Sequence, residues 1–375
     1  MRDLESNSGL TVREARPGER HALLALVARI DAESDFLLRE PGERPFWARD
    51  LAAFQASGNA TIFVAQVAAQ TAPNGPAELV GYLSAYGGRF LRNRGVVTLA
   101  VGVRRDWNGR GIATRLFAAA EDWARRGGAH RLELTVAETN TRALSLYERL
   151  GFLDEGQMRD ALRVNGAWRN ERLMGKAIGS EDVPEWPALT PAAPPPPLAP
   201  APAPTPVGRL EIRPALPADA AAYLAYDRAV RSETHFLMRT AAESLPDVAA
   251  ARRFLAEQRI GDRTVTLLAV VDGTIAGSLS LWTGAYARTA HEAGLGLAVR
   301  RDFWALGIGG RLIAAADLWV RARGLHRLSL WVFGHNSRAR RFYAKHGFRE
   351  EAVARRHGLI GGQMTDHVLM AKLYG

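Results

Sequence analysis

Apolar residues recur at helical spacing shortly after an apolar run in the first half of the chain. The run Val96–Arg104 is rich in valine and predicts a strand. The stretch from about Gly111 to Arg126 predicts an amphipathic helix that stops before a pair of glycines. The residues that set its period are Ile112, Leu116, Ala119 and Trp123. The pattern therefore predicts a strand that enters a helix through a glycine turn.

Other runs rich in Val, Leu, Ile, Thr and Tyr predict the remaining strands of this half. They lie near Leu10–Glu14, Ala60–Ala69 and Glu78–Tyr86, and turn residues Pro73, Asn74 and Gly75 separate the last two. The strand RLELTV and a helix opened by Asn140 follow the amphipathic helix. The predicted order is strand, helix, helix, three strands, helix, strand, helix, two strands, which is an α/β class with a mixed sheet.

The second half of the chain repeats this pattern. When Val299 is placed on Val103, about 50 residues align without a gap, and about half of them are identical. The upstream segments also correspond, since TVREARPGE resembles EIRPALPAD and AESDFLLRE resembles SETHFLMRT. Each half is therefore predicted to be one complete copy of the fold.

A proline-alanine stretch separates the two copies. Residues 185–207 show neither helical period nor strand alternation, and such a composition favours an extended spacer rather than a core element. A docking ligand for a proline-recognising module is the alternative. The predicted organisation is a first domain over 1–178, a linker over 179–208 and a second domain over 209–375.

Composition narrows the class of protein. The chain has 375 residues, 47% of them hydrophobic, and no cysteine, which excludes disulfides, thiolate metal sites and a cysteine nucleophile. The opening MRDLESNSGL lacks an apolar signal core, and no apolar run is long enough for a membrane span, so we expect a cytoplasmic protein. We also expect no metal site. The net charge of +10 is spread over scattered arginines, which argues against nucleic acid as the partner.

The turn between the predicted strand and helix has the character of an anion site. In NGRGIA, Gly109 and Gly111 let the backbone approach a ligand, and the first amides of the helix point outward with the positive end of its dipole behind them. The second copy reads WALGIG, where Ala305 replaces the first glycine and Leu306 replaces Arg110. A tight connection without a ligand is the structural alternative.

The larger pattern around the turn resembles the GNAT superfamily of acyltransferases. It comprises VRRDW–x–G–x–GIA, the strand RLELTV, Asn140, Ala143, Tyr147 and a GF pair, and the second copy repeats it with Asn336, Ala339 and Tyr343. The ends of the copies, RVNGAWRNERLM and RHGLIGGQMTDHVLM, are similar to those of small prokaryotic N-acetyltransferases. The resemblance covers nearly the whole chain outside the linker. It implies two GNAT folds in tandem, each a mixed, mostly antiparallel sheet flanked by helices.

The resemblance implies that acetyl-CoA lies between the fourth and fifth strands, with its pyrophosphate on the amides of the glycine turn. This family usually begins the turn with Gln or Arg, and this chain has Asn108 and Trp304 there. The implied cofactor-binding residues of the first copy are Val101, Val103, Asn108, Gly109, Arg110, Gly111, Ile112, Ala113 and Asn140. Those of the second copy are Leu297, Val299, Leu306, Gly307, Ile308, Gly309 and Asn336.

The resemblance also implies catalytic roles. Tyr147 and Tyr343 stand where the family often places the tyrosine that protonates the CoA sulfur, and packing against the sheet is the alternative. Glu292, beside His291, is the candidate general base of the second copy, where the first copy has Val96. Glu133 on the fifth strand is a candidate for the first copy.

Two further glutamates and the two asparagines have open roles. Glu33 and Glu233 recur in the segment that lines the acceptor side in this family, so they hold a substrate amine or form structural ion pairs. Asn140 and Asn336 cap their helices, contact the pantetheine arm, or do both.

The function expected from these features is acetyl-CoA-dependent transfer of an acetyl group to a primary amine of a small molecule, peptide or protein. One half is expected to be more active than the other, in a monomer of two pseudo-repeats or a homodimer. The alternative is a non-catalytic acyl-CoA-binding scaffold of the same fold. A nucleic-acid-associated protein is a third hypothesis.

Overall fold

The computed structural model describes residues 9–68, 78–179, 208–258 and 263–375. The chain divides into two compact units. Unit 1 comprises 1–89, 94–154 and 172–187, and unit 2 comprises 90–93, 155–171 and 188–375. The expected turn at Pro73, Asn74 and Gly75 and nearly all of the expected linker lie outside the described residues.

The predicted order of helices and strands is confirmed in both copies. The strands of the first copy are β1 (Thr11–Glu14), β2 (Ala60–Val67), β3 (Glu78–Gly87), β4 (Val96–Val103), β5 (Arg131–Ala137), β6 (Leu153–Val164) and β7 (Ala167–Ala177). Its helices are α1 (Arg20–Glu33), α2 (Leu51–Ala56), α3 (Ile112–Arg126) and α4 (Thr141–Arg149). The strands of the second copy are β8 (Leu210–Pro214), β9 (Thr264–Val271), β10 (Thr274–Thr283), β11 (Glu292–Val299), β12 (Arg327–Phe333), β13 (Arg349–Ile360) and β14 (Gln363–Leu373). Its helices are α5 (Ala220–Glu233), α6 (Val248–Glu257), α7 (Ile308–Ala322) and α8 (Ser337–Lys345).

The sheet of each copy is mixed and mostly antiparallel, as predicted. In unit 1, β1, β2, β3 and β4 pair antiparallel in that order, and β4 then pairs parallel with β5. In unit 2, β8 to β11 repeat this arrangement, β11 pairs parallel with β12, and β12 pairs antiparallel with β14. A parallel pair requires a crossover connection, and α3 and α7 provide it.

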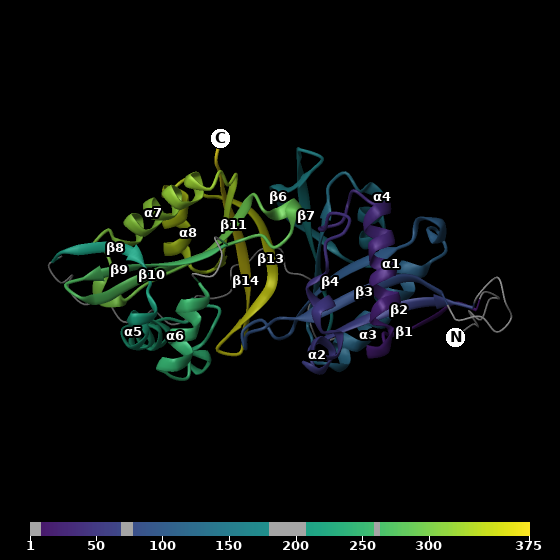
Figure 1. The fold of residues 1–375 in the computed structure, drawn as a ribbon, viewed down its shortest axis with the longest axis horizontal. Coiled ribbons are helices and arrows are strands. Elements are labelled where there is room, and N and C mark those ends of the chain that lie inside the picture. The colour runs from purple at the N-terminus through teal and green to yellow at the C-terminus, as the bar shows by residue number, and fades with distance from the viewer. Residues whose placement is uncertain (1–8, 69–77, 180–207, 259–262) are drawn as a thin grey trace. The chain divides into compact units, whose positions relative to one another are not determined.

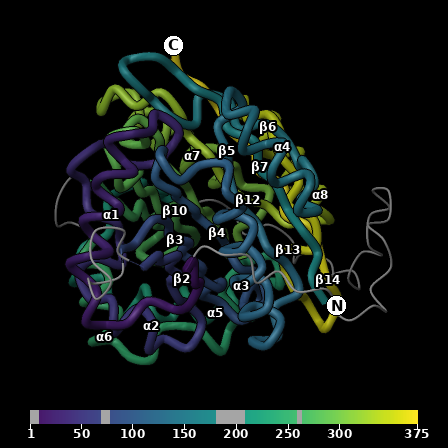
Figure 2. Tube along the Cα trace, turned by 90° about the vertical axis from the view of Figure 1, so that its right-hand side faces the viewer, coloured from purple at the N-terminus to yellow at the C-terminus, as the bar shows by residue number. Residues whose placement is uncertain are grey.

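Helices cover both faces of each sheet because side chains alternate along the strands. On β2, Ile62 and Val64 pack with α1, whereas Phe63 and Ala65 pack with α3. Figure 2 shows α1 to one side of β2 and β3 and α3 to the other. In unit 2, Figure 1 shows α5 and α6 on one side of β9 and β10, with α7 and α8 on the other. Each copy thus buries two apolar layers against one sheet.

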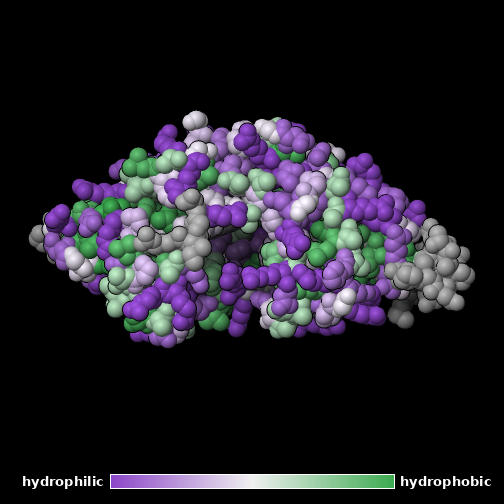
Figure 3. Space-filling model, viewed as in Figure 1, coloured by the Kyte–Doolittle hydropathy of each residue, from purple (hydrophilic) through white to green (hydrophobic). Residues whose placement is uncertain are grey.

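The surface seen in Figure 3 is mostly hydrophilic, with apolar residues scattered in small groups. Among the described residues, no helix is both long and apolar enough to cross a bilayer.

Unit 2 contains a segment from the first copy, residues 155–171, which comprises most of β6 and the start of β7. Gly156 of β6 pairs antiparallel with Ala352 of β13. A Cβ on Gly156 would lie 2.3 Å from the carbonyl oxygen of Glu351, so only glycine permits this approach. Residues 155–171 thus belong to the first copy in the sequence and pack within unit 2.

Candidate active site

The two strands of the parallel pair separate soon after they begin. β4 and β5 pair only from Val96 to Thr98 on the β4 side, and β11 and β12 pair only from Glu292 to Gly294 on the β11 side. Beyond these three residues each pair of strands continues without pairing. Backbone and side chains beyond the split are therefore available to a ligand at the same place in both copies.

The glycine turn of the first copy lies at the end of β4. Gly109 and Gly111 have φ angles of +83° and +73°, and Gly111 is the N-cap of α3. Residues other than glycine rarely adopt such angles, and nothing lies within 4 Å of a Cβ placed on Gly111. The first amides of a 15-residue helix are thus open to an anion.

Two arginines stand beside this turn. The guanidinium of Arg110 lies 4.4 Å from the centre of the Trp107 ring. Arg142 of α4 comes within 3.9 Å of the position that a Cβ on Gly109 would take. The turn therefore combines helix amides with cationic side chains, as a pyrophosphate requires.

The second copy keeps this geometry with a different charge. Gly307 has a φ of +77° and is the N-cap of α7, and Ala305 adopts the left-handed angle of +65° in place of glycine. Arg338 of α8 lies 4.2 Å from the ring centre of Trp304, whose Nε1 donates to the carbonyl oxygen of Val299 at 2.8 Å. Arg338 thus supplies a cation at a turn that lacks an equivalent of Arg110.

The positions of Arg142 and Arg338 at the glycine turns were not predicted from the sequence. Each stands two residues after the asparagine of its copy, in NTR and NSR. A search for arginines shared between the copies near the turn would have found them.

The asparagines cap their helices, as one alternative predicted. The side chain of Asn140 accepts from the backbone amide of Ala143 at 3.2 Å, and that of Asn336 accepts from Ala339 at 3.1 Å. Contact of either side chain with the pantetheine arm stays a prediction.

The two tyrosines are equally enclosed. Tyr147 and Tyr343 are 8% and 7% exposed and pack edge-on against Phe117 and Phe342 respectively. Burial raises the pKa of Tyr147 to about 12 and also raises the pKa of Tyr343. Both phenols therefore keep their protons at neutral pH, which a proton donor requires.

The carboxylate of Glu292 is fixed between a hydroxyl and a buried guanidinium. Ser329 Oγ donates to Glu292 Oε1 at 2.5 Å, and Arg327 Nε lies 3.3 Å from the same oxygen. Arg327 is fully buried and also donates to Glu351 at 2.5 and 3.1 Å. This arrangement holds the carboxylate of Glu292 against Ser329, which stands in the last paired position before β11 and β12 part.

The first copy has the same three groups with the carboxylate on the other strand. Thr98 Oγ1 of β4 donates to Glu133 Oε1 of β5 at 3.2 Å, and Arg131 Nε donates to Glu133 Oε2 at 3.2 Å. Arg131 is fully buried, like Arg327. Thr98 corresponds to Gly294, and Glu133 corresponds to Ser329. The structure thus brings Glu133 into contact with the first-copy split.

Two neighbours of Glu292 are held by the segment 155–171 of unit 2. His291 Nε2 makes a hydrogen bond of 2.8 Å with the carbonyl oxygen of Asp160. Arg327 Nη1 donates to the carbonyl oxygen of Arg159 at 2.6 Å. Burial lowers the pKa of His291, which keeps the imidazole neutral near pH 7. His291 therefore has a hydrogen-bonding role at this site.

Glu33 and Glu233 occupy equivalent structural positions. Glu33 accepts from the backbone amide of Arg105 at 2.8 Å, and Glu233 accepts from that of Arg301 at 2.7 Å. The hydrogen bond from Arg105 is the main reason why the pKa of Glu33 is lowered. Glu33 also forms an ion pair with Arg29 at 3.0 Å, and Glu233 forms one with Arg300 at 3.7 Å, as the structural alternative describes.

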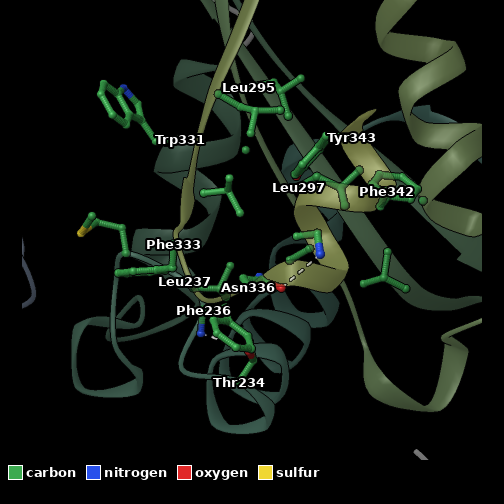
Figure 4. A pocket seen from close by; sticks show the side chains of 18 of the residues that line it. Thr234, Phe236, Leu237, Leu295, Leu297, Trp331, Phe333, Asn336, Phe342 and Tyr343 are labelled. Carbon is green, nitrogen blue, oxygen red and sulfur yellow. Dashed lines mark hydrogen bonds between the residues drawn. The ribbon is translucent and has the colours of Figure 1, made fainter. Parts of the chain in front are cut away.

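A cavity of about 1290 Å³ occupies the split of unit 2. Figure 4 shows Leu295, Leu297 and Tyr343 on one side of it and Trp331 and Phe333 on the other. Eight residues expected at the cofactor or the chemistry line it, namely Glu292, Leu297, Val299, Gly307, Ile308, Gly309, Asn336 and Tyr343. Leu306 does not line it. Within the described part of the chain, no group of three or more metal-ligating side chains is placed to hold a metal ion.

One protein-family model matches this chain, in both of its copies. The model of the acetyltransferase (GNAT) family matches residues 30–152 and 232–348. An L-amino acid N-acetyltransferase, AaaT of Escherichia coli (strain K12), is 29% identical over 123 residues, which are 31% of this chain and 74% of the relative.

Two solved structures of acetyltransferases are similar to part of this chain. An acetyltransferase of the GNAT family from Streptococcus pneumoniae is 34% identical with a TM-score of 0.43, over 44% of this chain and all of that protein. A ribosomal-protein-alanine N-acetyltransferase from Brucella melitensis is 26% identical with a TM-score of 0.40, over 44% and 99%.

Proposed function

This chain belongs to the GNAT acetyltransferase family, and we propose that it transfers an acetyl group from acetyl-CoA to a primary amine of a small molecule or peptide, mainly in its second half. The observation that carries the proposal is the cavity of unit 2, which joins the glycine turn at Gly307 to Tyr343 and Glu292. A phosphate site, a proton donor and a carboxylate thus share one space.

The residues of both turns fit the pyrophosphate of acetyl-CoA. Positive φ angles at Gly111 and Gly307 leave open space above the helix amides. Arg110 and Arg142 would bind phosphate oxygens in the first copy, and Arg338 would do so in the second. The pantetheine arm would lie along Val101 and Val103 in the first copy, and along Leu297 and Val299 in the second.

Acetyl-CoA supplies an activated acetyl group when it is bound. The amine nitrogen forms a bond to the acetyl carbon as the carbon–sulfur bond breaks, one proton leaves the nitrogen, and one joins the sulfur. We assign the first proton to Glu292, which Ser329 and Arg327 hold in place, directly or through water. The second proton comes from the hydroxyl of Tyr343, which its buried site keeps protonated.

The proposal also covers the acceptor, the cellular compartment, the oligomeric state and the domain limits. A relative named for L-amino acid acetylation supports a small amine as acceptor. We place the reaction in the cytoplasm, in a monomer of two pseudo-repeats or a homodimer. The domain limits that we propose are 1–178 and 209–375, joined by a linker over 179–208.

Titration of acetyl-CoA into the full chain, followed by a thiol-release assay with an amine panel, tests this function. Because the chain has no cysteine, a thiol reagent reports only released CoA. We expect binding of acetyl-CoA and amine-dependent thiol release. Binding without release for any amine would instead identify an acyl-CoA-binding scaffold, and the absence of binding would overturn both.

A further inference from the structure

Six aromatic and imidazole rings form a continuous row in unit 2. We call this the ring row, and it consists of Trp331, His357, His367, Phe333, His335 and Phe236. Successive ring centres lie 5.8, 4.8, 4.1, 6.1 and 5.2 Å apart. Trp331 and His357 are stacked, with 3° between their planes. These rings come from β12, β13, β14 and two connections, so the chain assembles them from distant segments.

Five members of the ring row line the cavity, namely Trp331, Phe333, His357, His367 and Phe236, the last from the connection after α5. In Figure 4, Phe236 and Phe333 face the space below Leu297, and Trp331 stands further along β12. The Trp331 side chain is 44% exposed, so the fold does not need its burial. Such a wall favours a flat apolar ligand.

A second tryptophan lines the same cavity. Trp282 of β10 lies directly against Gly294 of β11, where a Cβ would approach the indole to 2.5 Å. Trp282 is 48% exposed and lines the same cavity. Gly294, which has no side chain, therefore leaves the space that the Trp282 ring occupies.

The charges of the cavity argue against a polycationic acceptor. Among its described lining residues, Glu292 supplies the one carboxylate, and Ser329 and Arg327 already engage it. The cationic lining residues of the cavity are Arg338, which lies over the Trp304 ring, and Lys345. A second ammonium group on the acceptor would lose water without gaining an anionic partner. An apolar wall also favours the neutral, reactive form of a single amine.

The ring row is a property of the second copy and not of the fold. The equivalent positions in the first copy are Thr135, Ala161, Glu171, Ala137, Thr139 and Phe36. Five of the six rings are therefore missing there, although the sheet and helices are the same. Because the same sheet and helices form without these five rings in the first copy, we attribute the rings of the second copy to ligand binding.

We infer that the second half binds a monoamine with a planar aromatic body, with its ring on Trp331, Phe333 and Phe236 and its amine toward Glu292. This inference rests on the proposed function and narrows its acceptor to arylalkylamines. The aromatic body supplies the binding, and the single amine matches the single carboxylate of the cavity.

Steady-state thiol release by the full chain at saturating acetyl-CoA tests the acceptor class. The amines are 2-phenylethylamine, 2-cyclohexylethylamine of similar size without aromaticity, and the diamine cadaverine. We expect kcat/KM for 2-phenylethylamine to exceed that for the cyclohexyl amine by about threefold to tenfold and that for cadaverine by about 100-fold. Equal or greater kcat/KM for cadaverine would overturn the inference and leave the proposed function standing.

A variant set locates the site. Trp331→Thr installs the residue of the first copy, and we expect it to raise KM for 2-phenylethylamine about tenfold with little change for cadaverine. Trp331→Phe keeps a ring and should restore most of the loss. Leu318→Thr, at a residue 70% exposed on α7, is the matched control and should change neither. An unchanged KM in Trp331→Thr contradicts the assignment.

Direct binding decides the inference even if no amine is acetylated. Calorimetric titration of 2-phenylethylamine into CoA-saturated full chain and into its Trp331→Thr variant gives a readout independent of turnover. Binding that weakens about tenfold in the variant supports the aromatic site. Equal binding by both proteins, or binding by neither, rejects it, whereas absent thiol release rejects only the proposed function.

Discussion

The two copies share one fold but place their chemistry differently. At the split of the first copy the carboxylate is Glu133 on β5, beside Thr98, whereas the second copy has Glu292 on β11, beside Ser329. A fully buried arginine faces the carboxylate in each copy. The carboxylate and the hydroxyl have thus exchanged strands between the two copies. The local ion pair is kept, but a base would act from a different strand. A shared fold therefore does not fix which strand carries the carboxylate.

The copies also differ in what surrounds the split. The first has two arginines at its glycine turn, and the second has one arginine and an alanine in a left-handed conformation. The second alone carries the ring row. We conclude that the first copy is better suited to hold phosphate, and the second to hold an acceptor.

Replacement of Glu292 by Gln should have the largest effect of the single substitutions considered. The amide keeps a hydrogen bond with Ser329 but takes up no proton, so we expect kcat to fall about 100-fold to 1000-fold at saturating acetyl-CoA. Glu133→Gln is the matched control and should change kcat less than about threefold. Steady-state thiol release measures both. Equal losses in the two variants would remove the functional distinction between the copies.

Tyr343→Phe is expected to lower kcat by about 10-fold to 100-fold without changing the affinity for acetyl-CoA, because only the proton donor is lost. Tyr147→Phe, at an equally buried position, should leave turnover almost unchanged. Calorimetry gives the affinity and thiol release gives kcat. Weaker acetyl-CoA binding with unchanged kcat would show that the Tyr343 hydroxyl contributes to binding alone.

The buried phenols should behave alike in stability even though they differ in turnover. Burial raises the pKa of Tyr147 to about 12, whereas an unfolded tyrosine titrates near 10. The stabilisation is present in full below about pH 10 and is lost as pH rises through 12, because the unfolded chain releases the proton first. For Tyr147 this amounts to about 3 kcal/mol.

Urea unfolding at pH 9 and pH 11 tests this linkage. Tyr147→Phe and Tyr343→Phe should each reduce the alkaline loss of the free energy of unfolding relative to the parent chain. A variant that keeps the full alkaline loss would show that its tyrosine is not a source of it.

The left-handed alanine gives the smallest expected effect. Ala305→Gly should raise the free energy of unfolding by about 0.5–1 kcal/mol, because glycine adopts a φ of +65° without strain. Gly109→Ala at the equivalent turn should lower it by about 1 kcal/mol. Thermal unfolding measures both. A lower midpoint for Ala305→Gly would mean that the methyl group contributes packing that exceeds the backbone strain.

Local features of this chain were predictable from the sequence, and distant contacts were not. The asparagine caps and the glycine turns depend on residues within a few positions, so motifs and spacing found them. The pairing of Gly156 with Ala352 and the ring row join residues up to about 200 positions apart. Hydrophobic period holds no information on which distant strand lies alongside.

The most direct test of whether acetyl transfer occurs in the second half is thiol release by two full-length variants, Gly307→Val and Gly111→Val. The acceptors are 2-phenylethylamine and 2-cyclohexylethylamine. Both glycines have positive φ and open space above them, so valine is strained and obstructs the phosphate site in either copy. We predict that Gly307→Val loses about 100-fold or more of the activity and that Gly111→Val stays within about threefold of the parent. Loss in Gly111→Val with full activity in Gly307→Val would contradict the assignment of acetyl transfer to the second half.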